Sequence, residues 1–436
     1  MNEIMPASAI KTAERLFVVF ALLFFTYPII GLLQQQPEGL TAADLARLDA
    51  VWKIIRWGIY AVTLLLLVSQ WKSALGVASR DKLLWGLVGL ALLSVLWSDL
   101  PATTLRRSIG LVATTLFGVY LAKRYSIKEQ LQLLAWMFGI AAVLSLLLAI
   151  ALPIYGIHLG GWRGIYSNQN LLGRLMCLGA VVFLILARSS SQYRWIAWAG
   201  CGFTATLMLA STSKTALVVF LAILVLLSAY QLWQRYYPIP LPWLLAAIVL
   251  GSCAIWWLLG NLEIVTGLLG KDITLTQRTI IWEIVLAKIG QHPWLGYGYS
   301  AFWSNLQNTQ DIVRATGSSH VIGGQSHNGF LDLWLDFGAL GALIFALHFS
   351  SKLPQAFRWL RSVQTGEGLW PLTLMSFTIL YNLTESTLLT KYSIFWIVYV
   401  AAMLSITSSA GSSAGSSESN AEDAEDKQSI FQIESS

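Results

Sequence analysis

The stretch QSHNGFLDLWLDFGALGALIF, residues 325–345, decides the fold, because a polar loop ends there and an apolar helix begins. Its polar and small residues gather at the start of that helix: His327, Asn328, Asp332, Asp336, Gly338 and Gly341. The two aspartates are four residues apart and so share a helix face, and the glycines leave room for a neighbouring helix. Ionisable side chains in a membrane helix are energetically unfavourable and are usually kept only where they have a function. The stretch therefore predicts a functional site at the mouth of a membrane helix.

The rest of the chain is mostly apolar. Of its 436 residues, 56% are hydrophobic and 11% are charged, whereas charged residues make up about 25% of ordinary soluble domains. Because roughly 20 apolar residues cross a bilayer as a helix, the composition predicts an all-α, polytopic membrane protein. The net charge of +6 comes from Lys and Arg scattered between apolar runs rather than gathered in a stripe. This pattern argues against nucleic acid as a partner.

The apolar runs predict about twelve membrane spans. Their approximate bounds are 16–33, 54–70, 83–98, 108–122, 132–152, 171–187, 195–210, 215–233, 241–259, 328–349, 370–384 and 392–407. Basic residues fall in alternate short loops, for example Lys72, Lys123 and Arg188, and loops of this kind face the cytoplasm. With an even number of spans, both termini are expected in the cytoplasm.

The pattern divides the chain into a transmembrane domain, residues 1–407, and a tail, residues 408–436. The tail is rich in Ser, Gly, Asp and Glu, so we expect it to be disordered and cytoplasmic. One large hydrophilic loop, residues 260–327, interrupts the domain on the outer side. Within it, TLTQRTIIWEIVLAKIG has apolar residues at helical spacing but is too polar to span, which predicts an amphipathic helix on the membrane surface.

Four residues on the predicted outer face could carry chemistry: Arg163, Lys214, Arg278 and His327. Each also has a purely structural interpretation. Arg163 follows a Gly-rich turn and could anchor the interface, while Lys214 starts a Ser/Thr-capped helix and could snorkel. Arg278 could touch lipid phosphate. His327 follows a Gly-containing loop rather than lying among apolar neighbours, which favours a functional role.

Taken together, three cations and one base on one membrane face suit a substrate with a pyrophosphate leaving group. Arginine binds phosphate oxygens with a two-pronged fork, and lysine adds a compact charge. These cations would neutralise charge that builds on the departing phosphate. A histidine accepts protons near neutral pH, so His327 could deprotonate an attacking sugar hydroxyl.

Other chemistries lack their motifs in the sequence. The five histidines have no HExxH spacing, and there is no Walker loop or DxD pair; the single GxSxG match, GSSAG at residues 411–415, lies in the Ser- and Gly-rich tail. We therefore expect neither a metal nor a cofactor. The three cysteines, Cys177, Cys201 and Cys253, all fall in apolar runs, which predicts core residues rather than a disulfide or zinc site.

Several of these segments resemble the O-antigen ligase and polymerase superfamily, and in particular its exopolysaccharide polymerases. The resemblance covers about residues 80–405 and is strongest over 160–345. The segments that carry it are WRGIYSNQN, TSKT, QRTIIW, HPWLGYGYSAFW and SHNGFLDLWLDFG. It implies a metal-independent, inverting glycosyltransferase on the periplasmic face of a bacterial inner membrane. The implied donor is a glycan on undecaprenyl pyrophosphate, the implied acceptor is a glycan or lipid A core, and a chain-length regulator is a possible partner.

The resemblance also implies roles for individual residues. His327 would be the catalytic base, and Arg278 would bind the pyrophosphate. Arg163 and Asn328 would contribute to substrate binding. Lys214 stands where many members of the superfamily have arginine, so two-pronged binding is lost there, which counts against a strict lipid A ligase.

Two alternatives stay open. The first is an O-antigen ligase, which shares the chemistry but transfers the glycan to lipid A core. The second is a transporter or transport accessory of the inorganic carbon type, in which Asp332, Asp336 and Glu385 would form an ion path. A transporter is expected to hold such residues near the midplane on broken helices. Here the two aspartates lie within about two turns of the outer helix end, which favours a site that opens at the surface.

Overall fold

A computed structural model describes residues 7–28, 42–158, 160–189, 192–236, 275–316 and 324–407. These residues are helical, apart from loops and a two-stranded antiparallel hairpin in which Ile157 pairs with Trp162. The all-α prediction is therefore confirmed. The predicted span 241–259 and the predicted tail lie outside the described residues, as do Cys253 and parts of the predicted outer loop.

The helices and strands follow one another in a simple order. They are α1 (Ala7–Phe24), α3 (Ala42–Val68), α4 (Trp71–Ala78), α5 (Lys82–Leu93), η1 (Ser94–Leu96), α6 (Pro101–Arg124), α7 (Ile127–Ala151), α8 (Pro153–Gly156), β1 (Ile157–His158), β2 (Gly161–Trp162), α9 (Gln169–Ser189), α10 (Arg194–Ala210), α11 (Lys214–Tyr236), α14 (Leu275–Gln291), η2 (Phe302–Ser304), α15 (Leu306–Thr316), α16 (Gly329–Ser362), η4 (Gly366–Leu369) and α17 (Trp370–Asn382). A final helix spans Ile394–Thr407.

Five of the described helices are long and apolar enough to cross a membrane: α3 from Ala46, α7, α9, α11 up to Trp233, and α16. Two shorter apolar helices are Lys82–Leu96 and Ile394–Thr407. The protein is thus multi-pass, although this number is smaller than the twelve spans predicted. Large apolar side chains point outward from these helices, and Ile54, Trp136 and Val225 are 70% exposed or more. An apolar outer surface of this kind fits contact with lipid.

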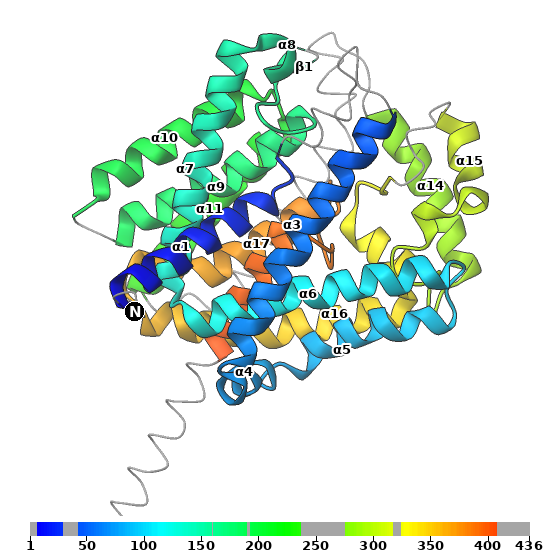
Figure 1. Ribbon diagram of the computed structural model, residues 1–436, viewed down its shortest axis with the longest axis horizontal. Helices are drawn as coiled ribbons and strands as arrows, with labels where there is room; N and C mark the ends of the chain where they lie inside the picture. Colours follow the sequence, from blue (N-terminus) through cyan, green and yellow to red (C-terminus); the bar gives the residue numbers. More distant parts are fainter. Residues whose placement is uncertain are drawn as a thin grey trace, which may run out of the picture.

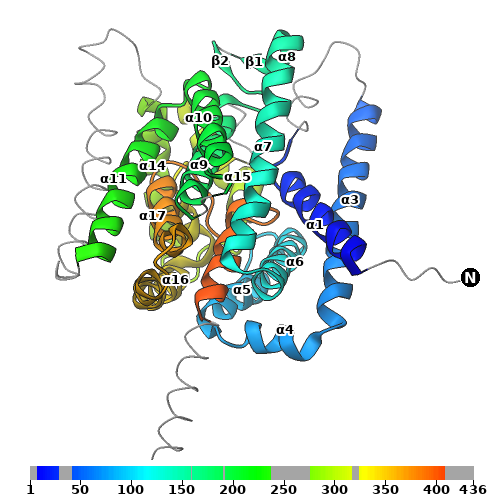
Figure 2. The same cartoon turned by 90° about the vertical axis from the view of Figure 1, so that its left-hand side faces the viewer.

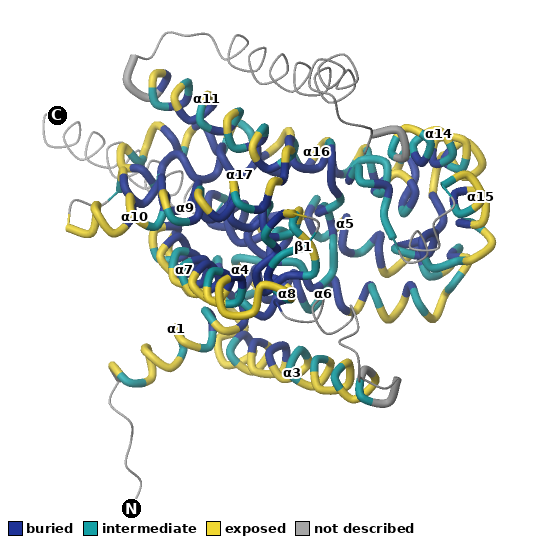
Figure 3. The backbone as a smooth tube through the Cα atoms, turned by 90° about the horizontal axis from the view of Figure 1, so that it is seen from above, coloured by how far each residue is buried: buried dark blue, intermediate teal, exposed yellow. Residues whose placement is uncertain are grey.

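The helices form a bundle with two flanks. Helices α1 and α3 lie on one side and α11 on the other, with α9, α17 and the final helix between them (Figures 2 and 3). Helices α14 and α15 lie together at one end of the bundle, above the right-hand ends of α5 and α6 in Figure 1. The centre is packed with aromatic side chains, and Trp370 and Trp396 are fully enclosed.

Helix α16 begins at Asn328 as predicted, runs 13 residues past the predicted end at 349, and is broken at Gly338, where φ is 61°. The loop 293–298 fills the break. The amides of Tyr297 and Gly298 donate to the carbonyl oxygens of residues 335 and 336, at 2.7 and 3.1 Å, and the amides of residues 339 and 340 donate to those of residues 293 and 294. A Cβ on Gly338 would lie 2.2 Å from the backbone of Trp294. The close neighbour predicted at this glycine is thus a loop and not a helix.

The predicted amphipathic helix at 274–290 forms as α14. Its apolar face, formed by Ile281, Val285 and Ile289, is buried against Phe302 and Leu335 in a second, smaller core. The protein itself therefore covers the apolar face that the sequence analysis assigned to lipid, while the position of this helix at the membrane surface stays a prediction. The packing places α14 against the start of α16.

A buried polar cluster joins the far half of α16 to α5. Asp81 caps α5 by accepting from the Leu84 amide at 3.0 Å. The carboxylate lies 2.6 Å from Lys352 Nζ and 3.3 Å from His348 Nδ1, and all three side chains are almost fully enclosed. Burial alone would raise the pKa of the Asp81 carboxyl. The contacts with His348 and Lys352 lower it by a larger amount, so the pKa lies well below its ordinary range.

Candidate active site around Glu385

Glu385 is the centre of a charged cluster in the loop between α17 and the final helix. Its side chain is only 9% exposed. Three groups from distant segments surround its carboxylate: Arg278 at 3.3 Å, His327 Nδ1 at 3.6 Å and Arg174 at 3.9 Å. They come from α14, from the loop before α16, and from α9. The fold therefore brings four separate parts of the chain to one carboxylate.

The loop that carries His327 is held firmly by its neighbours. The side-chain oxygen of Asn328 accepts from the amides of residues 330 and 331 and so caps α16. The Asp332 carboxylate accepts from the Ser326 amide at 3.1 Å and from Trp303 Nε1 at 2.9 Å. His327 itself has a φ of 56°, an uncommon conformation for a residue with a side chain. Local strain of this kind persists only where the surroundings enforce it, and here they aim the imidazole at Glu385.

Arg278 reaches the cluster from the first turn of α14. One guanidinium nitrogen donates to the carbonyl oxygen of Thr384 at 2.9 Å, and another donates to Glu385 at 3.3 Å. One turn further along α14, Trp282 Nε1 donates to the carbonyl oxygen of Ser326 at 2.8 Å. Helix α14 thus contacts both the Glu385 loop and the His327 loop, which fixes the arginine beside the histidine.

Arg174 has hydrogen-bond donors that the protein leaves unused. Its guanidinium lies over the rings of Tyr381 and Phe395, with its carbon 5.9 and 5.1 Å from the ring centroids. The Nε and Nη1 atoms are buried and have no hydrogen-bond partner among the described residues. Buried donors are nearly always bonded. These atoms can therefore donate hydrogen bonds to an oxyanion that enters the cluster.

The electrostatics of the cluster favour an anionic ligand. Burial alone would raise the pKa of the Glu385 carboxyl. The contact with His327 and the charges of Arg174 and Arg278 lower it by a larger amount. The net pKa is below the ordinary value, so Glu385 is ionised at neutral pH. Two arginines then face one carboxylate, and the remaining positive charge suits phosphate oxygens, which arginine binds with two parallel hydrogen bonds.

The structure brings two of the predicted site residues together, His327 and Arg278. Asn328 is adjacent, but its side-chain oxygen is occupied in capping α16. Arg163 is 4% exposed, and its guanidinium donates to the carbonyl oxygens of Tyr155 and Ile154, at 2.7 and 3.5 Å. The backbone contacts of Arg163 hold the hairpin of β1 and β2 against α8.

A chain of contacts links Lys214 to the charged cluster around Glu385. It is exposed at the start of α11, after a turn in which Ser213 accepts from the Ala216 amide at 3.5 Å. That turn packs against α9, since a Cβ on Gly173 would lie 2.6 Å from the Ser213 Cβ. Gly173 directly precedes Arg174. Lys214 therefore belongs to the same end of the molecule as the charged cluster.

The two residues that complete the cluster, Arg174 and Glu385, had weak signals in the sequence. Arg174 interrupts the apolar run of the predicted span 171–187, and a charge inside a membrane helix marks a functional site. Glu385 entered the sequence analysis only as part of an alternative ion path. Among the described residues, no group of three or more His, Cys, Asp or Glu side chains is placed to hold a metal ion.

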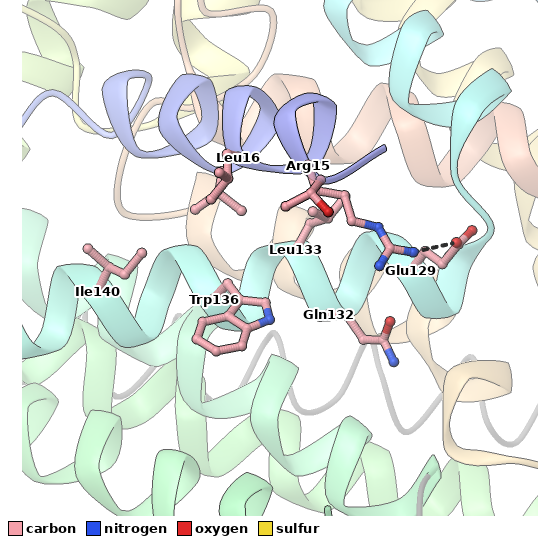
Figure 4. Close-up of a pocket in the computed structure, with 9 residues that line it drawn as sticks. Arg15, Leu16, Glu129, Gln132, Leu133, Trp136 and Ile140 are labelled. Atoms are coloured by element: carbon pink, nitrogen blue, oxygen red, sulfur yellow. Dashed lines mark hydrogen bonds and ion pairs between the residues drawn. The ribbon is translucent and has the colours of Figure 1, made fainter. Parts of the chain in front are cut away.

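A separate groove of about 250 Å³ runs between α1 and α7 (Figure 4). Leu16, Trp136 and Ile140 line it, and the ion pair of Arg15 with Glu129 lies at one end. None of its lining residues belongs to the Glu385 cluster. The groove is therefore not part of the candidate active site.

Comparisons with known proteins give one family match and two relatives. Residues 199–346 match the O-antigen ligase family model. The chain is 23% identical over 307 residues to the exopolysaccharide production protein ExoQ of Rhizobium meliloti, an alignment covering 66% of this chain and 68% of that protein. It is 24% identical over 260 residues to the general O-oligosaccharyltransferase of Acinetobacter baylyi, covering 54% of this chain and 44% of that protein.

The resemblance to the O-antigen ligase and polymerase superfamily is thereby confirmed, and it supports a part in membrane glycan polymerisation or ligation. The matched residues 199–346 include Lys214, Arg278 and His327. Arg174 and Glu385 lie outside that range, and the fold brings them together with the matched residues Arg278 and His327.

Proposed function

We propose that this protein is a polysaccharide polymerase: a metal-independent, inverting glycosyltransferase that uses a glycan on undecaprenyl pyrophosphate as donor. The attacking group is a hydroxyl of a second glycan, and the reaction takes place on the periplasmic face of a bacterial inner membrane. Both termini then lie in the cytoplasm, and the proposal includes a chain-length regulator as a partner. One observation carries the proposal: the unpartnered donors of Arg174 lie with Arg278 and His327 around one carboxylate.

In this mechanism Arg278 and Arg174 bind the donor pyrophosphate. Both guanidinium groups face Glu385 in the structure. A pyrophosphate would share these arginines with the carboxylate and take up the donors that Arg174 leaves unused. As the bond between the sugar carbon and the phosphate oxygen breaks, charge grows on the leaving group, and the preorganised arginines stabilise it.

His327 acts as the general base. Its Nδ1 faces Glu385 at 3.6 Å, and its side chain is 37% exposed, so Nε2 is the nitrogen left for an incoming hydroxyl. The imidazole takes the hydroxyl proton while the acceptor oxygen bonds to the anomeric carbon and the lipid pyrophosphate departs. This is a single displacement with inversion. Glu385 stabilises the imidazolium that forms.

A ligase that transfers the glycan to lipid A core would use the same chemistry. The relatives include proteins named for exopolysaccharide production and for oligosaccharide transfer. Alignment with the first covers more of both chains, and Lys214 lacks the arginine fork, so we favour polymerisation. Asn328 and Arg163 act in this proposal by shaping the rim of the site, through the cap of α16 and the hairpin.

One observation bears on the transporter alternative. Helix α16 is broken at Gly338, just after Asp336, as in many transporters. However, the carbonyl oxygens of residues 335 and 336 accept from loop amides, and Glu385 is paired with arginine. These groups are therefore occupied and poorly suited to coordinating a passing ion. We retain glycosyl transfer as the proposed function.

The test is reconstitution of the purified protein with a lipid-linked oligosaccharide, without added metal or nucleotide. Wild type and the control variant Lys53→Gln, an exposed position on α3, should make a ladder of longer lipid-linked glycans. His327→Ala should fold and insert but lose activity by about 10²–10⁴-fold, the usual contribution of a general base. Transfer only to an added lipid A acceptor would indicate the ligase. Wild-type chain growth by His327→Ala would exclude it as the base, and an inactive, folded wild type would refute glycosyl transfer.

A further inference from the structure

A second group of cations surrounds Tyr392, close to the Glu385 cluster. The Arg56 guanidinium carbon, from α3, lies 4.1 Å from the centre of the Tyr392 ring, and Lys391 Nζ lies 5.9 Å from it. Arg106 and Arg107, from the first turns of α6, act electrostatically on the same lysine. These four residues, which we name the Lys391 cluster, come from three separate parts of the chain.

The Lys391 cluster has more positive than negative charge. The acidic group that acts on Lys391 is Asp336, against the three arginines. Asp336 is itself engaged, since its Oδ1 accepts from the Ser300 amide at 2.8 Å. Burial lowers the pKa of Lys391, and Arg107 lowers it further, to about 7. The protein thus holds cations together against their mutual repulsion, and an anion would relieve that repulsion.

The ammonium of Lys391 is also available to a ligand. Its backbone amide donates to the Tyr299 hydroxyl at 3.1 Å, whereas its Nζ lies 5.9 Å from the centre of the Tyr392 ring and has no hydrogen-bond acceptor among the described residues. Arg107, by contrast, already donates to the carbonyl oxygen of Ser300 and to the Ser304 hydroxyl. The Lys391 side chain is half-buried, so an anionic ligand can reach its ammonium and supply the oxygen partner that favours its charged form.

The Lys391 cluster lies beside the candidate active site. Lys391 and Glu385 belong to the same loop, and six extended residues span at most about 20 Å. Two aspartates one turn apart on α16 connect the two clusters: Asp332 accepts from the Ser386 hydroxyl, and Asp336 acts electrostatically on Lys391. Lys391 therefore lies within about 20 Å of Glu385, so a glycan held at His327 can reach it.

We infer that the Lys391 cluster binds an oxyanion, a carboxylate or a phosphate, carried by a glycan substrate of the reaction at His327. The inference rests on the proposed function, because that function supplies the glycan. Two sources share this chemistry: an acidic sugar of the glycan, and the phosphate of a second lipid carrier. Arg56 and Lys391 supply the open donors, and Arg106 and Arg107 supply the surrounding field.

The first test measures binding to the full chain in phosphatidylcholine nanodiscs, without turnover. Trigalacturonic acid is the carboxylate probe, inorganic pyrophosphate is the phosphate probe, and maltotriose is the neutral control. Lys391→Gln should weaken trigalacturonate binding at least tenfold. Lys53→Gln, an exposed lysine on α3 paired with Asp49, should leave it unchanged. Loss of pyrophosphate binding alone would identify the carrier phosphate as the source, and unchanged binding of both anions would overturn the inference.

The second test uses pH. Since the pKa of Lys391 is about 7, its protonated fraction falls about tenfold between pH 6 and pH 8, whereas the probe carboxylates stay ionised. Trigalacturonate affinity should fall by about the same factor in wild type. Lys391→Arg stays charged and should remove most of this fall. A flat wild-type profile, or the same fall in Lys391→Arg, would contradict the assignment to Lys391.

A third variant separates this inference from the proposed function. Arg278→Gln should weaken pyrophosphate binding at the active site but leave trigalacturonate binding intact. If His327→Ala still made polymer, the proposed mechanism would fail while the binding results at Lys391 stood. If Lys391→Gln bound every probe like wild type while His327→Ala was inactive, only the Lys391 assignment would fail.

Discussion

The variant Glu385→Gln tests how the charged cluster works, because it removes one charge and keeps the shape. In the proposed reaction His327 becomes an imidazolium, and the carboxylate 3.6 Å away stabilises it. A glutamine cannot do so. The same change frees Arg278 and Arg174 from their counter-ion, so their attraction for a pyrophosphate increases. We therefore expect turnover to fall while the donor binds at least as tightly as to wild type.

The size of the effect follows from the geometry. Two unit charges 3.6 Å apart interact by about 4.6 kcal/mol at an effective dielectric constant of about 20. The His327 side chain is 37% exposed, and solvent screening reduces such an interaction to about half, roughly 2 kcal/mol. A loss of about 2 kcal/mol in the transition state lowers kcat about 30-fold.

The assay is steady-state turnover of a lipid-linked oligosaccharide by reconstituted protein, with kcat and KM determined separately. Glu283→Gln, an exposed position on the same helix as Arg278, is the matched control and should behave as wild type. Because the pKa of Glu385 is lowered, its charge persists above pH 5, so the wild-type profile near neutral pH should not show its titration. An unchanged kcat, with or without a rise in KM, would refute a role for Glu385 in stabilising the imidazolium.

Two further predictions concern stability, measured by unfolding in detergent. Asp81→Asn should lower the free energy of unfolding by about 3–5 kcal/mol, because it leaves Lys352 buried without its partner. Combining Asp81→Asn with Lys352→Met should recover much of that loss. Strictly additive effects of the two substitutions would contradict the pairing of Asp81 with Lys352. Since the pKa of Asp81 is depressed, its contribution should be present above about pH 4 and lost as the pH falls further. Gly338→Ala should destabilise by about 2 kcal/mol or more, because its φ is 61° and the new Cβ would meet Trp294. Gly290→Ala, with open space around it, should be neutral or slightly stabilising, and equal effects of the two alanines would argue against the break in α16.

Features that depend only on residues adjacent in the sequence could be predicted from it. The apolar composition required helices that expose apolar side chains to lipid, since a bilayer leaves the backbone no other partner than itself. Asn328 marked the start of α16, because a side-chain amide oxygen satisfies the first free amides of a helix. The spacing of apolar residues along 274–290 predicted α14 correctly. His327 and Arg278 were also identified, by their residue types and by the resemblance of their flanking segments to a family.

The partners of these residues were decided only by the tertiary structure. Arg278 and Glu385 are 107 residues apart in the chain, and Glu385 gains its central place only because α9, α14, α16 and the loop after α17 converge on it. The break at Gly338 likewise depends on a loop that ends 40 residues earlier and satisfies the exposed backbone groups. The face of α14 was assigned to the membrane surface because an apolar stripe does not specify what covers it. Periodicity and capping are properties of a few adjacent residues, whereas ion pairs and broken helices are set by which distant segments pack together.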